Sequence, residues 1–296
     1  MRKKVLIIVG GGIYGCIPAR LLADLPRHLQ GIDKVDCLSG CSIGGILAVA
    51  YAAGHTFGEM DEFFQTRAGD CFSRRFMARV NPLACPTYDA DSLEEVIQEV
   101  LGNTTMQDTR LRYPNLDLFI PGLNITDDRY KVFDNIDDMS VKLSTVARIT
   151  SAAPSYFSGK SYHRKCYIDG GLIEVAPLMT AATALKGKRG VHFADMDVLM
   201  IGTGKDVDEK PLTPKEYNAL GLLGLATKVI VPYTTMANEM ATVYWGNNMG
   251  FNSFTYFNPC KHNGELDDVD QIPEMVRQAD RYSKEFTEVY QDWLYK

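Results

Sequence analysis

The pentapeptide Gly40-Cys41-Ser42-Ile43-Gly44 is the stretch of this 296-residue chain whose residue types point most directly to chemistry. It follows a strand-like run, Lys34–Leu38, and leads into an apolar, alanine-rich segment that ends at Gly54. A strand, a sharp turn with serine at its apex and a helix form the setting of a nucleophilic serine. The same letters also fit a glycine-rich turn in which Ser42 only caps the helix. The flanking strand and helix favour the nucleophile.

A second glycine-rich stretch, Gly10-Gly11-Gly12-Ile13-Tyr14-Gly15, follows the apolar run Val5–Val9. Its spacing matches the phosphate-binding turn of dinucleotide-binding folds, which also requires an acidic residue at the end of the second strand. Here that strand ends in Ser39-Gly40, so a dinucleotide-binding oxidoreductase is the less favoured interpretation. The loop can instead present backbone N–H groups to a developing oxyanion. In a parallel sheet the carboxyl ends of neighbouring strands meet, so this loop and the serine turn can share one crevice.

A serine nucleophile needs a base that accepts its proton. Asp169 is the strongest candidate, because it follows the strand-like run Lys165–Ile168 and precedes Gly170 and Gly171. Its carboxylate can therefore project from the same edge of the sheet as Ser42. An ordinary Asp-Gly turn is the other interpretation of these residues. None of the five histidines lies in a motif-like setting: His28, His55, His163, His192 and His262.

The rest of the pattern predicts the elements that hold these residues in place. Strand-like runs alternate with helical segments, which predicts an α/β fold with a largely parallel central sheet and helices on both faces. We expect helices from the glycine loop to about Leu29 and from Pro177 to Gly187. From Thr213 onward the chain is predicted to be mostly helical. The length suits a single domain over residues 1–296, completed by a helical region at 206–296.

Composition limits the classes of partner and cofactor. The chain is 46% hydrophobic, with a net charge of −6 and no run of basic residues, which makes nucleic acid an unfavoured partner. Seven cysteines without metal-ligand spacing predict a reduced, intracellular protein, and we expect no metal or other cofactor. No apolar run reaches the roughly 18 residues of a membrane span. We therefore expect a cytoplasmic protein.

Five motifs together carry a resemblance to a known family. They occur in the same order as in patatin-like phospholipases, at compatible spacing, and the resemblance covers residues 4 to about 205. The motifs are the glycine loop Gly10–Gly15, the Gly40–Gly44 pentapeptide, Ala147–Phe157 (Ala-Arg-Ile-Thr-Ser-Ala-Ala-Pro-Ser-Tyr-Phe), Asp169-Gly170-Gly171 and Met200–Gly204.

The resemblance implies a three-layer patatin-like fold and the hydrolysis of lipid acyl esters by a Ser–Asp dyad without histidine. The family nucleophile falls on Ser42 and its aspartate on Asp169. The glycine-loop amides of the family oxyanion hole fall on Gly11 and Gly12, and the geometry of a serine elbow adds the Ile43 amide. The implied substrate is a phospholipid or another acyl lipid; the sequence leaves the oligomeric state open.

Three positions depart from the family pattern. Val9 replaces a common aspartate, Tyr14 a common basic residue, and Val175-Ala176 a common asparagine before Pro177. These departures motivate an alternative, a catalytically silent module that acts by binding. Two apolar stretches, 57–77 and Leu220–Pro232, are most simply core, and alternatively form an acyl groove or a lid that contacts a membrane surface transiently.

Overall fold

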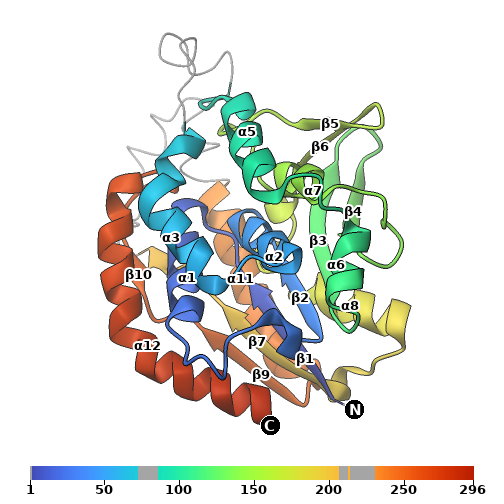
Figure 1. The fold of residues 1–296 in the computed structure, drawn as a ribbon, viewed down its shortest axis with the longest axis vertical. Coiled ribbons are helices and arrows are strands. Elements are labelled where there is room, and N and C mark those ends of the chain that lie inside the picture. The colour runs from blue at the N-terminus through green and yellow to red at the C-terminus, as the bar shows by residue number, and fades with distance from the viewer. Residues whose placement is uncertain (1, 73–85, 207–212, 214–230) are drawn as a thin grey trace.

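The computed structural model describes residues 2–72, 86–206, 213 and 231–296. Within them, eight strands form one mixed sheet in the order β5-β6-β3-β2-β1-β7-β9, with β4 paired to the other edge of β3 (Figure 1). The strands of the sheet are β1 (Lys3–Ile8), β2 (Cys37–Gly40), β3 (Asp117–Asn124), β4 (Arg129–Asp134), β5 (Lys160–Tyr162), β6 (Lys165–Asp169), β7 (Met196–Ile201) and β9 (Ser253–Phe257).

Helices cover both faces of this sheet (Figure 1). The helices are α1 (Cys16–Ala23), α2 (Ile43–Ala53), α3 (Phe57–Arg67), α5 (Ala90–Leu101), α6 (Met106–Arg112), α7 (Leu143–Thr150), α8 (Leu178–Arg189), α11 (Val231–Asn248) and α12 (Ile272–Tyr295). Short 3-10 turns lie at Gly12–Gly15 (η1), Ala68–Phe72 (η3) and Gly170–Leu172 (η4), among other places. The predicted α/β fold with helices on both faces is confirmed.

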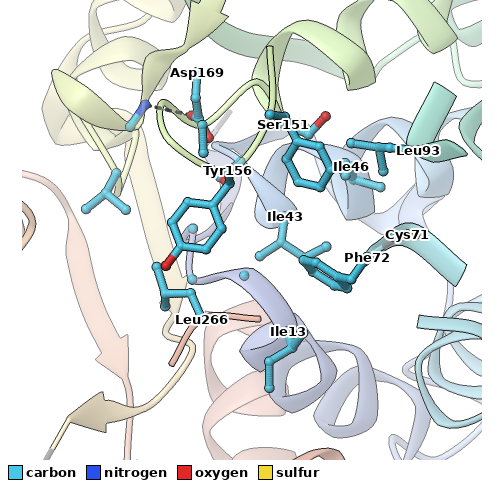
Figure 2. Close-up of a pocket in the computed structure, with 18 of the residues that line it drawn as sticks. Ile13, Ile43, Ile46, Cys71, Phe72, Leu93, Ser151, Tyr156, Asp169 and Leu266 are labelled. Carbon is cyan, nitrogen blue, oxygen red and sulfur yellow. Dashed lines mark hydrogen bonds between the residues drawn. The ribbon is translucent and has the colours of Figure 1, made fainter. Parts of the chain in front are cut away.

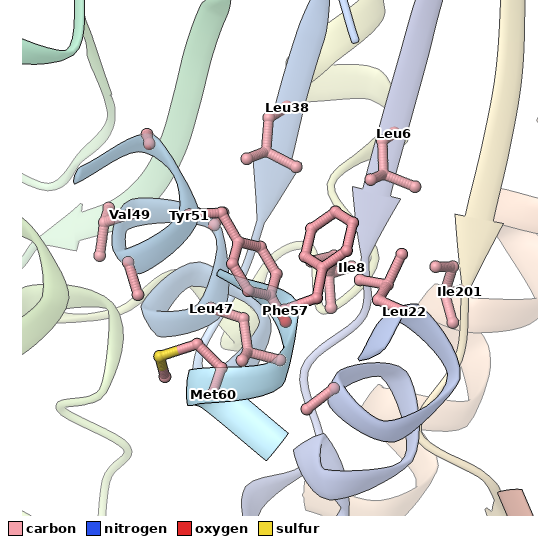
Figure 3. Packing of buried hydrophobic residues seen from close by; sticks show 14 of the residues in the cluster. Leu6, Ile8, Leu22, Leu38, Leu47, Val49, Tyr51, Phe57, Met60 and Ile201 are labelled. Atoms are coloured by element: carbon pink, nitrogen blue, oxygen red, sulfur yellow. The ribbon is translucent and has the colours of Figure 1, made fainter. Parts of the chain in front are cut away.

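Strand β1 shows how the sequence produces two cores. Alternate side chains of a strand point to opposite faces, so a strand that is apolar throughout must be covered on both. Leu6 and Ile8 pack under α1, α2 and α3, whose Leu22, Tyr51, Phe57 and Met60 are seen in Figure 3. Val5 and Ile7 face the other way, toward Leu178, Ala181 and Leu185 of α8. The central strands are thus fixed between two layers of helices.

The two strands that precede the candidate residues meet end to end along β3. Strand β2 runs parallel to β3 and pairs with Asp117–Phe119, whereas β6 runs antiparallel and pairs with Gly122–Asn124. Since β4 occupies the opposite edge of β3 over Phe119–Asn124, β2 and β6 share one edge. Their carboxyl ends therefore face each other across a gap of two β3 residues.

Several predicted boundaries need correction. Helix α1 ends at Ala23 rather than near Leu29, because Pro26 disfavours helical geometry in the residue before it. Helix α8 passes through Gly187 and ends at Arg189, where Gly190 takes the left-handed conformation with φ 68°.

The C-terminal region also differs from the helical prediction. It contains α11 and α12, but β9 extends the central sheet beside β7, and β10 (Lys261–His262) pairs with β8 (Lys205–Asp206). Residues 206–296 therefore complete the sheet as well as its helical cover. Most of the predicted groove or lid at Leu220–Pro232 lies outside the described residues.

Candidate active site

Ser42 lies at the apex of the turn between β2 and α2, in a conformation that few residues adopt. Its φ of 54° and ψ of −128° are unfavourable for a side chain with a Cβ. The turn is also tight, since a Cβ on Gly40 would lie 2.1 Å from the Gly44 carbonyl oxygen and one on Gly44 2.2 Å from the Ile8 oxygen. The Ser42 side chain makes no capping hydrogen bond to α2. The interpretation of Ser42 as a helix cap is therefore wrong.

Thr150, the last residue of α7, supports this turn from the side. Its hydroxyl oxygen accepts the Ser42 backbone N–H at 2.9 Å. That bond occupies the Ser42 amide and leaves the next amide, that of Ile43, at the open N-terminus of α2. The Ile43 amide has no acceptor among the described residues, as the first amides of a helix lack partners within it.

Asp169 ends β6 and lies beside the serine turn, because β2 and β6 meet end to end. Its carboxylate accepts the Gly171 N–H at 2.8 Å and the Cys41 thiol at 3.3 Å. Burial raises the pKa of Asp169 from 3.8 to about 6, against the lowering effect of hydrogen bonds from Gly171, Ser42 and Cys41. A carboxylate with this pKa is a better proton acceptor than an exposed one.

Cys41, the neighbour of Ser42, is the less suitable nucleophile. The side chain is fully buried, and burial together with the charge of Asp169 raises its pKa well above 9.0. A thiol in this state carries little thiolate, the reactive form. Its observed contact is as a hydrogen-bond donor to Asp169.

The glycine loop runs beside the serine turn, and two of its backbone N–H groups have no hydrogen-bond acceptor in the described part of the chain. Gly10 N–H donates to the Val175 oxygen at 3.0 Å, and Ile13 N–H donates to the Leu266 oxygen at 2.8 Å. Between them, the amides of Gly11 and Gly12 have no acceptor in the described part of the chain. Gly12 has φ 57°, and a Cβ there would lie 2.1 Å from the Leu266 oxygen. Glycine is required at this position.

A mostly apolar cavity of about 200 Å³ opens beside these groups. Ser42, Asp169 and Gly10–Gly12 are among the residues that line it. In Figure 2, Asp169 lies on one side of the cavity, and Ile46, Leu93 and Phe72 lie on the other. The aromatic stretch after α2 contributes to this wall, as one of its two interpretations proposed. The further apolar lining residues include Ile13, Ile43, Phe63, Phe64, Ala68, Cys71, Pro154, Tyr156, Phe157, Leu172, Val175 and Leu266.

The structure brings together Ser42, Asp169, Gly11, Gly12 and Ile43, all of which the sequence singled out. Gly10, Gly15, Gly40, Gly44, Gly170 and Gly171 lie at close contacts around them. No histidine is among the described residues that line the cavity. His262 instead stacks on Tyr14, with ring centroids 3.8 Å apart.

Sequence analysis assigned no structural role to three residues that hold the site: Thr150, Val175 and Leu266. Thr150 lies within Ala147–Phe157, one of the five motifs that carry the resemblance, so the sequence already marked this segment as part of the site. Val175 and Leu266 act through backbone carbonyl oxygens, which every residue type has, so residue type does not reveal their role.

Comparisons with known proteins place the chain among described families. The model of the patatin-like phospholipase family matches residues 6–182. A protein of Escherichia coli named cGAMP-activated phospholipase is 32% identical over 266 residues, covering 80% of this chain and 73% of the relative. Its namesake from Vibrio cholerae is 28% identical, covering 80% and 75%.

More distant proteins share the fold. Patatin-like protein 1 of Oryza sativa is 26% identical, covering 75% of this chain and 63% of the relative. The crystal structure of VipD from Legionella pneumophila aligns with a TM-score of 0.53 at 11% identity, covering 98% of this chain and 67% of VipD. The family model matches more than half of the chain and the Escherichia coli relative is 32% identical, so the chain belongs to the patatin-like phospholipase family.

Proposed function

We propose that this chain hydrolyses acyl esters of phospholipids or related lipids, with Ser42 as nucleophile and Asp169 as general base. The observation that carries the proposal is the position of a strained serine beside a buried carboxylate at one side of an apolar cavity. Membership of the family supports a lipid substrate.

The reaction proceeds in two steps. Asp169 takes the proton of the Ser42 hydroxyl while Ser42 Oγ attacks the ester carbonyl carbon, and the proton then passes to the leaving alcohol. In the second step Asp169 takes a proton from water while the water oxygen attacks the carbonyl carbon of the acyl-serine. The proton then passes to Ser42 Oγ as its bond to the acyl group breaks and the fatty acid is released. The Asp169 pKa of about 6 suits both directions of proton transfer near neutral pH.

The developing oxyanion is assigned to the amides of Gly11, Gly12 and Ile43. All three lack acceptors among the described residues, whereas the neighbouring amides of Gly10, Ile13 and Ser42 are each occupied. Backbone donors that are already oriented contribute most when charge develops on the substrate. The apolar wall formed by Ile46, Phe72 and Leu93 accommodates the acyl chain.

A fluorophosphonate probe tests the nucleophile. The probe should label the peptide that contains Ser42, and labelling should disappear in Ser42→Ala while Cys41→Ala remains labelled. Hydrolysis of a phospholipid mixture by wild-type protein, with Ser42→Ala as control, identifies the lipid class. Labelling at Cys41, or hydrolysis that persists in Ser42→Ala, would refute the assignment.

Two alternative functions predict different results. A protein that binds lipid but neither reacts with the probe nor hydrolyses any ester is a silent binding module, for which Val9, Tyr14 and Val175 are the motivation. Micromolar binding of NAD or FAD in calorimetry would instead support the oxidoreductase.

Further features of the protein are proposed on the same basis. The 296 residues act as one domain in the cytoplasm, with transient contact to a membrane surface during lipid uptake. No helix in the described ranges combines the length and the apolar character needed to cross a membrane. Vesicle flotation with and without substrate lipid tests the membrane contact.

Regulation can be tested in the same assay. Two relatives are named cGAMP-activated phospholipases. We propose that this chain is activated in the same way. Hydrolysis should rise when cGAMP is added, and equal rates with and without it would reject the activation while leaving the hydrolase proposal intact.

A further inference from the structure

Glu174 is a buried carboxylate five residues after Asp169, and the mechanism above does not use it. It is 8% exposed, and it lies at the N-terminus of α8, which has no side-chain cap of the usual kind. Glu174 Oε1 accepts the Met179 N–H at 2.6 Å, and Oε2 accepts the Thr180 hydroxyl at 2.6 Å. The Tyr130 hydroxyl lies 3.2 Å from Oε2.

These contacts satisfy amides that would otherwise lack partners. The first turn of a helix presents free N–H groups and the positive end of its dipole, and both favour an anion. An asparagine is common in the family just before Pro177, whereas this chain has Val175-Ala176 there. In this chain Glu174, two positions before Ala176, accepts the Met179 and Thr180 amides.

The segment 170–177 connects the two halves of the site. At its start, the Gly171 N–H donates to Asp169 Oδ1 at 2.8 Å. Near its end, the Val175 oxygen accepts the Gly10 N–H at 3.0 Å, directly before the amides assigned to the oxyanion. Between them, Glu174 N–H donates back to the Gly170 oxygen at 3.0 Å, which closes the turn.

We propose that Glu174 is a positioning residue. Its hydrogen bonds to the N-terminus of α8 fix the segment 170–177, and this segment in turn holds the Asp169 carboxylate and the glycine loop in place relative to each other. The inference rests on the proposed function for the roles of Asp169 and the loop. Glu174 does not line the cavity, so it acts on catalysis through the segment and not by touching substrate.

The chemistry explains why a carboxylate is suited to this role. Three donor groups converge on its two oxygens: the Met179 amide, the Thr180 amide and the Thr180 hydroxyl. The Tyr130 hydroxyl lies 3.2 Å from Oε2 and 2.8 Å from the Thr180 hydroxyl oxygen. Glutamine keeps one acceptor oxygen but brings an NH₂ group toward the Thr180 amide at 3.2 Å, where two donors would oppose each other. Glu174→Gln should therefore be intermediate between wild type and Glu174→Ala.

The test compares Glu174→Ala and Glu174→Gln with Thr105→Ala as matched control. Thr105 caps α6 with its hydroxyl and pairs with Asp108, but α6 is not connected to the segment at 170–177. Turnover is measured on a short-chain ester and divided by the number of Ser42 sites titrated with fluorophosphonate. Hydrogen exchange of the Gly10 and Gly171 amides is followed in the same proteins.

We expect Glu174→Ala to lower kcat per titrated site about 10²-fold, the scale of a small misplacement of catalytic groups, with KM changed by less than about threefold. Exchange at Gly10 and Gly171 should accelerate about tenfold or more, since both amides lose a fixed acceptor. Thr105→Ala should lower thermal stability and leave kcat per site and both exchange rates unchanged.

A Glu174→Ala protein with wild-type kcat per titrated site and wild-type exchange at both amides would overturn the proposal, whatever its stability. If Glu174→Ala does not fold, Glu174→Gln is judged by the same two measurements. If instead the proposed function is wrong, the wild-type protein will show slow exchange at the Gly10 and Gly171 amides but no hydrolysis that depends on Ser42.

Discussion

Replacing Asp169 with asparagine should abolish hydrolysis and at the same time stabilise the folded protein. Asparagine keeps the size of the side chain and an oxygen that can accept the Gly171 N–H, but it cannot accept the Ser42 proton. The carboxylate is buried, and burial raises its pKa to about 6, so the folded protein is destabilised whenever this group is ionised. The neutral amide removes that cost.

The sign and size of the effect follow from the pKa. A carboxyl group whose pKa is raised on folding costs stability as pH rises through the range from 3.8 to about 6, and the full cost is present above it. At 1.36 kcal/mol per pKa unit, the cost is about 3 kcal/mol at pH 8 and about 2 kcal/mol at pH 5. The stabilisation by Asp169→Asn should therefore shrink by about 1 kcal/mol between these two pH values.

Urea denaturation of both proteins at pH 5 and pH 8 measures this difference, with ester hydrolysis recorded in parallel. Ser42→Ala is the control, because it is also inactive but keeps the buried carboxylate. If Asp169→Asn is less stable than wild type at pH 8, the assignment of Asp169 as a desolvated carboxylate is wrong. If it keeps near-full activity, Asp169 is not the base.

The remaining predictions concern turnover and substrate choice. The pH profile of kcat/KM should rise with a midpoint near 6, so activity at pH 5 lies about tenfold below its plateau; a flat profile down to pH 5 contradicts this. Gly12→Ala should lose about 10²-fold in kcat or more, because its Cβ would collide with the Leu266 oxygen at 2.1 Å. Gly102→Ala is its control, since Gly102 has the same φ of 57° but open space around it, and an equal loss there would reject the explanation. Leu93→Ala should raise the preference for longer acyl chains, by up to about fourfold per added methylene, as measured by kcat/KM over a series of esters. An unchanged series would place the acyl chain elsewhere.

Local sequence was enough to locate Ser42 and Asp169. The turn at Ser42 is built from residues within a few positions of it, and each glycine there is required by a contact inside the same motif or with the adjacent strand. Patterns of this kind can be found without knowledge of the whole fold. The same holds for β3 and β4, since the strand-like runs Leu116–Ile125 and Arg129–Phe133 are joined by the polar turn Thr126-Asp127-Asp128.

Long-range backbone contacts could not be predicted in this way. Leu266 fixes the glycine loop through its carbonyl oxygen, which every residue type possesses, and it lies 253 positions from Ile13. Strand β9 was missed because it is short and lies between two long helices. Gly187 was expected to end α8, but the site is open, and a glycine inside a helix costs only about 1 kcal/mol.

Because β2 and β6 meet end to end along β3, the length of β3 between their pairings sets the distance between Ser42 and Asp169. The span between the two pairings is set by Ile120 and Pro121 alone. Each strand residue adds about 3.3 Å, more than a hydrogen bond tolerates, so one inserted residue here would separate Ser42 from Asp169. Proline lacks an N–H, and Pro121 occupies a place where neither β2 nor β6 offers a pairing residue. Among relatives that keep the reaction, differences in length should therefore collect in the turn between β3 and β4 and be absent from this two-residue span.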